Sequence, residues 1–207
     1  MQQVQPQRRS YVGWIIFGVV VLAAISLISS YNALVALSQA VDAQWGQVQN
    51  VYQRRADLVP NLVATVKGAA NFEKSTYVAV TQARASVGQI SPQVLQNAVN
   101  DPNAMAQYQA TQDKLDSALS RLLVTVENYP QLKASENFLT LQAQLEGTEN
   151  RIAVERRRYN EAAQAFNVRR NTFPTVLYAG LFGSAFNSKS YFQAAPGAQN
   201  APQVNFQ

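Results

Sequence analysis

The chain has 207 residues, enough for one domain of ordinary size in addition to a single membrane segment. It contains no cysteine and no histidine, which excludes disulfides, thiol nucleophiles and thiolate metal sites and removes the commonest general base and transition-metal ligand. The net charge is +5 and only 14% of the residues are charged, but 47% are hydrophobic, so a core can still form.

The first predicted element is a transmembrane helix. Residues 11–28 read YVGWIIFGVVVLAAISLI and carry no charge. Eighteen helical residues extend about 27 Å, close to the thickness of a hydrocarbon core. Tyr11 and Trp14 lie at one end and Tyr31 lies just beyond the other, where aromatic side chains favour the membrane interface. We therefore predict a transmembrane helix over residues 11–30.

The residues on either side of this segment predict its orientation. The polar N-terminal tail, residues 1–10, carries Arg8 and Arg9, whereas the first basic residue after the segment is Arg54. Basic residues favour the cytoplasmic side, so we expect a single-pass membrane protein with its N-terminus in the cytoplasm and its bundle outside. The alternatives are a cleaved signal peptide, whose apolar core is typically shorter, and a buried helix of a soluble protein.

Helical spacing continues after the membrane segment and predicts helices at about 31–71, 73–88, 103–129 and 134–172. Apolar residues of the first recur every seven positions on two interleaved frames, as in a coiled-coil seam. The first frame holds Leu34, Val41, Val48, Leu62 and Ala69 with Arg55 between them, and the second holds Trp45, Tyr52, Val59 and Val66. Because both frames stay in phase across Pro60, a kinked helix is favoured over a restart.

The last of these helices has the most regular frame. Its members are Phe138, Leu145, Ile152, Tyr159, Phe166 and Phe173. Residues 88–103, which are rich in Gly, Pro and Asn, form the main predicted loop, and no alternating strand pattern competes. The fold class is therefore all-α: after the membrane helix we expect an elongated antiparallel up-down-up-down four-helix bundle over residues 31–173.

An aromatic segment of short helical or interfacial character is predicted at residues 174–192, before a tail at 193–207 whose composition indicates disorder. If the first bundle helix leaves the membrane, the fourth returns to it. Arg169, Arg170 and the aromatic residues at 173–192 would then lie near lipid headgroups as a second membrane contact. In the alternative interpretation, these aromatic side chains simply close the end of the bundle core.

Several stretches of this chain resemble the LemA family of bacterial membrane proteins. They are YNALV at 31–35, QRRADLVPNLVATVKGAANFEKS at 53–75, YPQLKASENFLTLQAQLEGTENRIAVERRRYN at 129–160, then FP, FG, YF and a PQVNF ending. The resemblance implies a membrane helix and an antiparallel helical domain. It supplies no catalytic residues, and it associates some relatives with the shaping of internal bacterial membranes. The chain departs from the family pattern at Phe72, where relatives often have a histidine, and at FGSAF in place of FGF.

The sequence offers no complete catalytic, cofactor or metal site. Glu146 and Glu149, and likewise Asp113 and Asp116, are spaced three apart, but without histidine they cannot complete the usual di-metal site of a helical bundle and are interpreted as solvated charge. No G-x-S-x-G motif and no phosphate-binding glycine loop occurs, and a lysine-assisted serine would need a buried lysine nearby.

Arginine is concentrated near the end of the predicted fourth helix. The cluster comprises Arg151, Arg156, Arg157, Arg158, Arg169 and Arg170. Interleaved glutamates indicate a charged outer face and argue against nucleic acid binding. Arg55 differs because it lies on a core frame, and a buried arginine needs a partner. We predict that Arg55 or Arg54 pairs with Glu149 across the bundle.

Three functions remain open from the sequence. The leading one is a non-catalytic scaffold or adaptor that is anchored in the lipid bilayer and contacts an unidentified protein or a second copy of itself. The next is membrane shaping or envelope maintenance through direct lipid contact of residues 173–192. The third is an enzyme that uses carboxylates, serine or tyrosine, which would require a concave pocket with converging polar groups. No small-molecule substrate is evident.

Overall fold

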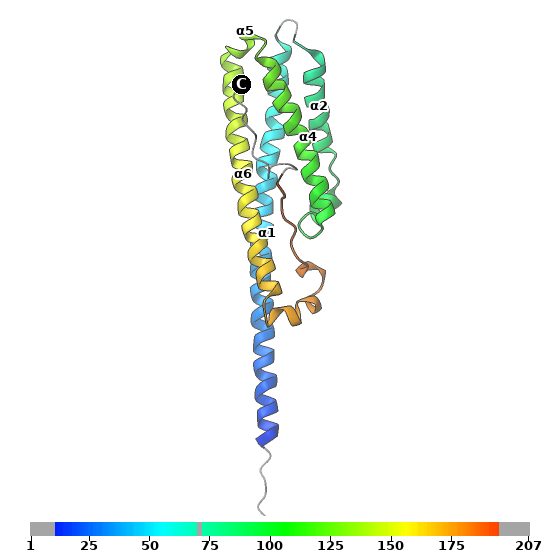
Figure 1. Cartoon of the computed structure of the whole chain (residues 1–207), viewed down its shortest axis with the longest axis vertical. Helices are drawn as coiled ribbons and strands as arrows, with labels where there is room; N and C mark the ends of the chain where they lie inside the picture. The colour runs from blue at the N-terminus through cyan, green and yellow to red at the C-terminus, as the bar shows by residue number, and fades with distance from the viewer. Residues whose placement is uncertain (1–10, 70–71, 195–207) are drawn as a thin grey trace, which may run out of the picture.

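The computed structural model describes residues 11–69 and 72–194, and within them the regular structure is entirely helical (Figure 1). The elements are α1 (Tyr11–Lys67), α2 (Lys74–Gly88), α3 (Pro92–Asn97), α4 (Pro102–Val126), α5 (Pro130–Lys133), α6 (Glu136–Asn171) and the 3₁₀ turns η1 (Thr175–Leu177), η2 (Ala179–Phe182) and η3 (Ser184–Phe186). The predicted polar tail, residues 1–10, and residues 195–207 of the predicted disordered tail lie outside this description.

Helix α1 is continuous for 57 residues, so the expected membrane segment and the first bundle helix are one element. Residues 29–32, Ser-Ser-Tyr-Asn, do not interrupt it, and it stays helical through Pro60. Its first part is apolar and, by length and composition, long enough to cross a membrane. No residue of that apolar part, residues 11–28, is buried, unlike the core helix of a soluble protein. The two parts of α1 are therefore rigidly joined.

The remaining helices lie beside the second part of α1 and form with it a helical rod. Helix α6 runs antiparallel to α1 and packs along it (Figure 1). Helices α2 and α4 form a second pair, which flanks only the half of the rod that lies farther from the apolar part of α1, called here the far half. The loop between α2 and α4 contains α3, which packs on α4. Side-chain caps stabilise the first turns of α3 and α4. The Ser91 hydroxyl accepts from the N–H of Val94, and the Asp101 carboxylate accepts from the N–H of Asn103 at 2.9 Å.

The rod contains two apolar clusters that lie one above the other. The cluster nearer the apolar end of α1 includes Trp45 and Phe166, and the farther one includes Leu62 and Leu122. The sequence frames predicted most of these positions: all the named members of the two α1 frames are buried except Ala69, which is partly buried. Arg55, the single charged member, lies at the boundary between the two clusters.

One member of the α6 frame was predicted wrongly. Phe138, Leu145, Ile152, Tyr159 and Phe166 are buried, but Phe173 is 73% exposed. Helix α6 ends at Asn171, and Thr172 has an extended backbone, so the helical stripe stops before it reaches Phe173. Pro174 disfavours helical geometry at Phe173, the residue directly before it, which fits a helix that ends ahead of Phe173.

Candidate functional site

The most buried charge in the described chain is Arg55, which is 2% exposed. Its Nη2 donates to the carbonyl oxygen of Gln112 at 3.0 Å and to Gln112 Oε1 at 2.9 Å. Its Nη1 donates to Glu149 Oε1 at 3.0 Å and lies 3.8 Å from Asp116 Oδ1. The guanidinium also sits 5.1 Å from the ring centre of Tyr52. These contacts join α1, α4 and α6 at one level.

The predicted pairing of Arg55 with Glu149 is confirmed, and Arg54 is exposed instead. Sequence reasoning missed Gln112. Its position was visible as a polar residue four after Tyr108 and three before Leu115 on the buried face of α4. Because Nη1 and Nη2 of Arg55 are bonded to groups on α4 and α6, the cluster can fix the register of three helices, while Nε is buried without a hydrogen-bond partner in the protein.

The carboxylate pairs found in the sequence do not come together as a site. Glu146 accepts from Gln142 on its own helix, whereas Glu149 and Asp116 both face Arg55. Loss of solvent raises the pKa of Asp113, with a smaller opposing contribution from the positive charge of Arg156. In residues 11–69 and 72–194, no three acidic side chains cluster in a way that could hold a metal ion.

The arginine cluster of α6 has two separate roles. Arg157 and Arg158 form local ion pairs with Glu161 and Glu155 at 3.7 and 2.9 Å, as expected for a charged outer face. Arg156 and Arg170 instead hold the chain that follows α6. Arg156 donates to the carbonyl of Gln193 at 2.9 Å, and Arg170 donates to the carbonyl of Phe186 at 2.7 Å.

The C-terminal segment forms a strap, residues 187–193, which runs back along the rod (Figure 1). Asn167 exchanges two hydrogen bonds with the backbone of Lys189, and Asn160 does the same with Phe192. Phe192 is buried against Trp45 and Tyr159. Phe192 of the strap is therefore part of the core. No periodic pattern in the sequence predicted this packing.

Before the strap, the chain turns against α1 where its apolar part ends. The Tyr178 hydroxyl lies 3.2 Å from Ser26 Oγ and 2.8 Å from Ser30 Oγ. Tyr31 packs on Phe182 and Phe186, with ring centres 5.2 and 5.5 Å apart. The two interpretations of residues 173–192 thus apply to different side chains. Phe186 and Phe192 close the core, as the alternative proposed, but four apolar side chains of this segment remain exposed: Phe173, Val176, Leu177 and Leu181.

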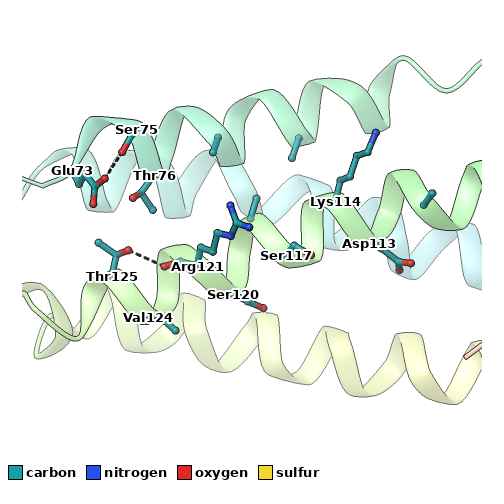
Figure 2. A pocket seen from close by; sticks show the side chains of 14 residues that line it. Glu73, Ser75, Thr76, Asp113, Lys114, Ser117, Ser120, Arg121, Val124 and Thr125 are labelled. Carbon is teal, nitrogen blue, oxygen red and sulfur yellow. Dashed lines mark hydrogen bonds between the residues drawn. The ribbon is translucent and has the colours of Figure 1, made fainter. Parts of the chain in front are cut away.

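A surface groove of about 1060 Å³ runs between α2 and α4, which pack against each other, on the far half of the rod (Figure 2). Its walls carry small side chains, among them Ala79 and Ala83 of α2 and Ser117 of α4. Lys114 and Arg121 extend from α4 across the opening, and Glu73 accepts a hydrogen bond from Ser75 at one end. Lys114 is exposed, so the groove does not hold the buried lysine that a lysine-activated serine requires.

Helix α2 is loosely packed beside this groove, since Val80 is its only buried residue. The groove is open, and the one serine in it with a printed carboxylate partner is Ser75, whose acceptor Glu73 is, like Ser75 itself, exposed to solvent. What it offers is an open, mainly small-residue surface with two cations, Lys114 and Arg121, and two carboxylates, Glu73 and Asp113, on which another helix could pack closely.

Comparisons with known proteins find relatives named as magnetosome proteins and one named LemA. Magnetosome protein MamQ 2 of Paramagnetospirillum magneticum is 26% identical over 191 residues, covering 86% of this chain and 70% of the relative. Magnetosome protein MamQ of Magnetospirillum gryphiswaldense is 24% identical and covers 86% of this chain and 71% of the relative. Protein LemA of Metamycoplasma hominis is 27% identical over 132 residues, 64% of this chain and 55% of the relative.

The family model described as the LemA family matches residues 44–206. The match begins within α1, after its apolar part, and includes α2 to α6, the strap and the chain beyond it. It therefore covers the helices that carry Arg55, the groove and the asparagines that hold the strap. From this extent of the match, the chain belongs to the LemA family.

Proposed function

We propose that this chain is a non-catalytic, membrane-anchored scaffold or adaptor that acts through protein contacts of its helical bundle. The observation that carries the proposal is the continuity of α1 from its exposed apolar part into the core of the rod. About 37 residues of α1 follow residue 30, which corresponds to a rod of roughly 55 Å. An unbroken helix would hold the far half of the rod at a fixed distance from the bilayer.

We further infer that α1, α2, α4 and α6 act as one elongated up-down-up-down bundle on the outer side of the bacterial inner membrane. The bundle is supported by the packing of α1 on both α6 and α2, and of α2 on α4. The orientation rests on Arg8 and Arg9 before the apolar part of α1, since basic residues favour the cytoplasmic side.

The contact surface in this proposal is the groove between α2 and α4. Small side chains let the backbone of an incoming helix approach closely, and the mixed charges of the lining, Lys114 and Arg121 with Glu73 and Asp113, favour a partner helix that carries charges of both signs. Its position on the far half of the rod would place such a partner away from the lipid. The loosely packed α2 leaves most of its surface free for the contact.

In-membrane crosslinking tests the proposal on the intact protein. A photoreactive residue at Ala79, in the groove, is compared with one at Ala153, an exposed alanine of α6 outside it. Both variants are crosslinked in cell membranes and the products are identified by mass spectrometry. Crosslinks between copies at Ala79 would support a self-assembling scaffold, and crosslinks to one other protein would support an adaptor. Equal crosslinking at the two positions would contradict a specific groove contact.

A second candidate function is membrane shaping or envelope maintenance by direct lipid contact of residues 173–192. The observation that favours it is the exposure of Phe173, Val176, Leu177 and Leu181 beside the apolar part of α1. The relatives named as magnetosome proteins are compatible with it. Electron microscopy of vesicles with and without the reconstituted protein separates the two functions, because a protein adaptor alone leaves vesicle shape unchanged.

A further inference from the structure

Most of the exposed large apolar side chains after α6 occur on a single short segment. Phe173 is 73% exposed, Leu177 70% and Leu181 82%, and Val176 is about half exposed. We call residues 173–182 the foot. The foot lies at the end of the rod from which the apolar part of α1 extends (Figure 1). Exposed apolar side chains grouped in this way mark a contact surface when they adjoin one another.

Hydrogen bonds to α1 fix the depth of the foot along the membrane helix. Tyr178 contacts Ser26 and Ser30, which lie in the last turns of the predicted span. On the same turns, Ile25 and Ile28 are 58% and 63% exposed, so lipid-facing side chains of α1 and the exposed side chains of the foot occupy one level. With α1 in a bilayer, the foot therefore meets the interface and cannot remain in bulk water.

The charges near the foot have a single sign. No acidic residue occurs in residues 10–41 or 162–207, whereas Arg169 and Arg170 immediately precede the foot. Arg169 reaches Ser30 Oγ from Nη2 at 3.4 Å, and its Nε is buried without a hydrogen-bond partner in the protein. The Arg169 side chain as a whole is partly exposed, so the accessible part of its guanidinium, at the level of the membrane interface, can donate to the oxygens of a phospholipid phosphate.

We propose that the foot inserts into the leaflet from which α1 emerges, with Phe173, Leu177 and Leu181 among the acyl chains near the headgroups. Arg169 lies above them and donates to a lipid phosphate. The rod is thereby attached to the bilayer at two adjacent places, the span of α1 and the foot, which fixes its tilt. This inference rests on the membrane anchoring proposed above. It adds which side chains contact lipid, at what depth they lie, and that Arg169 binds a lipid phosphate.

Depth-dependent fluorescence quenching tests the insertion on the full chain. Because the natural sequence has no cysteine, single cysteines can be labelled uniquely with an environment-sensitive fluorophore. We would compare Leu177→Cys and Leu181→Cys with Leu139→Cys, a half-exposed leucine at the far end of α6, and with Leu22→Cys in the span. The proteins are reconstituted in vesicles of phosphatidylcholine and phosphatidylglycerol that contain nitroxide-labelled lipid.

The expected result is quenching of the two foot labels by nitroxide near the headgroups, at least about threefold above the Leu139→Cys label, with protection from aqueous iodide. If Leu22→Cys is quenched deep in the bilayer but both foot labels behave like Leu139→Cys, the foot proposal is wrong and the anchor stands. If Leu22→Cys is not quenched either, the proposed anchoring itself fails.

The role of Arg169 is tested separately with Arg169→Gln in the Leu177→Cys background. We expect quenching at the foot to depend less on the phosphatidylglycerol content of the vesicles than it does with arginine present, because a charged donor to lipid phosphate has been removed. Arg157→Gln, in an exposed ion pair farther along α6, serves as the matched control. An identical lipid dependence for the Arg169 and Arg157 variants would overturn the assignment of Arg169.

Discussion

Arg84 of α2 donates a hydrogen bond from Nε to the main-chain carbonyl of Ala56 in α1 at 3.0 Å. In a regular α-helix this carbonyl accepts from the N–H of the residue four positions later, which here is Pro60 and has no N–H. Arg84 thus supplies the donor that the proline lacks. The bond explains how α1 remains one helix through Pro60 without leaving a backbone acceptor unsatisfied.

Replacing Arg84 with methionine should lower the free energy of unfolding by about 1–2 kcal/mol, since the Ala56 carbonyl loses its donor. In a Pro60→Ala background the same replacement should cost much less, because the alanine N–H restores the helical bond. Urea unfolding of the four proteins in detergent measures this coupling. Arg54→Met, at an exposed position of α1, should change stability by less than about 0.5 kcal/mol. If Arg84→Met lowers the free energy of unfolding equally with Pro60 and with Pro60→Ala, then Arg84 does not compensate for the missing N–H of Pro60.

The Arg55 cluster leads to a second prediction. Glu149→Ala should lower the free energy of unfolding by about 1–3 kcal/mol, which corresponds to a drop of several degrees in Tm. The reason is that Arg55 is buried and would keep Gln112 but lose its closest carboxylate. Thermal unfolding checks this against Glu146→Ala, which removes only a contact within α6. An unchanged Tm for Glu149→Ala would mean that the ion pair contributes nothing to stability.

The Arg55 cluster and the Arg84 bond show which features of the helical rod can be predicted from the sequence and which cannot. The seven-residue frames identified the buried stripes of α1 and α6 because burial of an apolar stripe is what stabilises a helix in a bundle. Arg55 could be paired in advance because a charge on a buried stripe must find an opposite charge. The bond of Arg84 could not be predicted in this way, because its acceptor is a backbone atom of another helix, which no residue pattern encodes.

The segment after α6 shows where prediction from sequence ends. Phe173 and Leu181 are exposed while Phe186 and Phe192 are buried, although all four are large apolar residues in one short stretch. No regular helix relates them, so spacing carries no information about which side faces the core. Their environments are set by tertiary contacts, chiefly the hydrogen bonds that hold the strap.

The strap itself gives a third prediction. Asn167→Ala should cost about 1–3 kcal/mol of unfolding free energy, because it removes both hydrogen bonds that the side chain exchanges with the backbone of Lys189. Local release should also be visible as faster amide hydrogen exchange at Ser190, whose N–H donates to the carbonyl of Val99. Asn171→Ala, at the exposed end of α6, is the control. Slow exchange in the Asn167 variant would show that the strap is held by its other contacts, among them buried Phe192 and the hydrogen bonds of Asn160, and does not need Asn167.

The fourth prediction concerns alkaline pH. Burial raises the pKa of Tyr52, Tyr108 and Tyr159 above the ordinary 10.0. Their folded-state pKa values exceed the unfolded ones, so their contribution to stability is constant below about pH 10. It falls above that pH, because the unfolded chain releases protons that the folded chain retains. Desolvation lowers the pKa of Lys189, so its contribution has the opposite sign and levels off above its ordinary 10.5.

Comparing wild type with Tyr108→Phe isolates one tyrosine from these opposing contributions. The loss of unfolding free energy above about pH 10 should be shallower in the variant by up to about 1.4 kcal/mol per pH unit, because one fewer buried group resists ionisation. Urea unfolding at a series of pH values between about 8 and 11 measures both slopes. A difference in unfolding free energy between the two proteins that is constant below pH 10 reflects packing of the side chain, and it is subtracted before the slopes are compared. Parallel curves for the two proteins would mean that Tyr108 ionises as readily in the folded chain as in the unfolded one, against its burial between Trp45 and Tyr52.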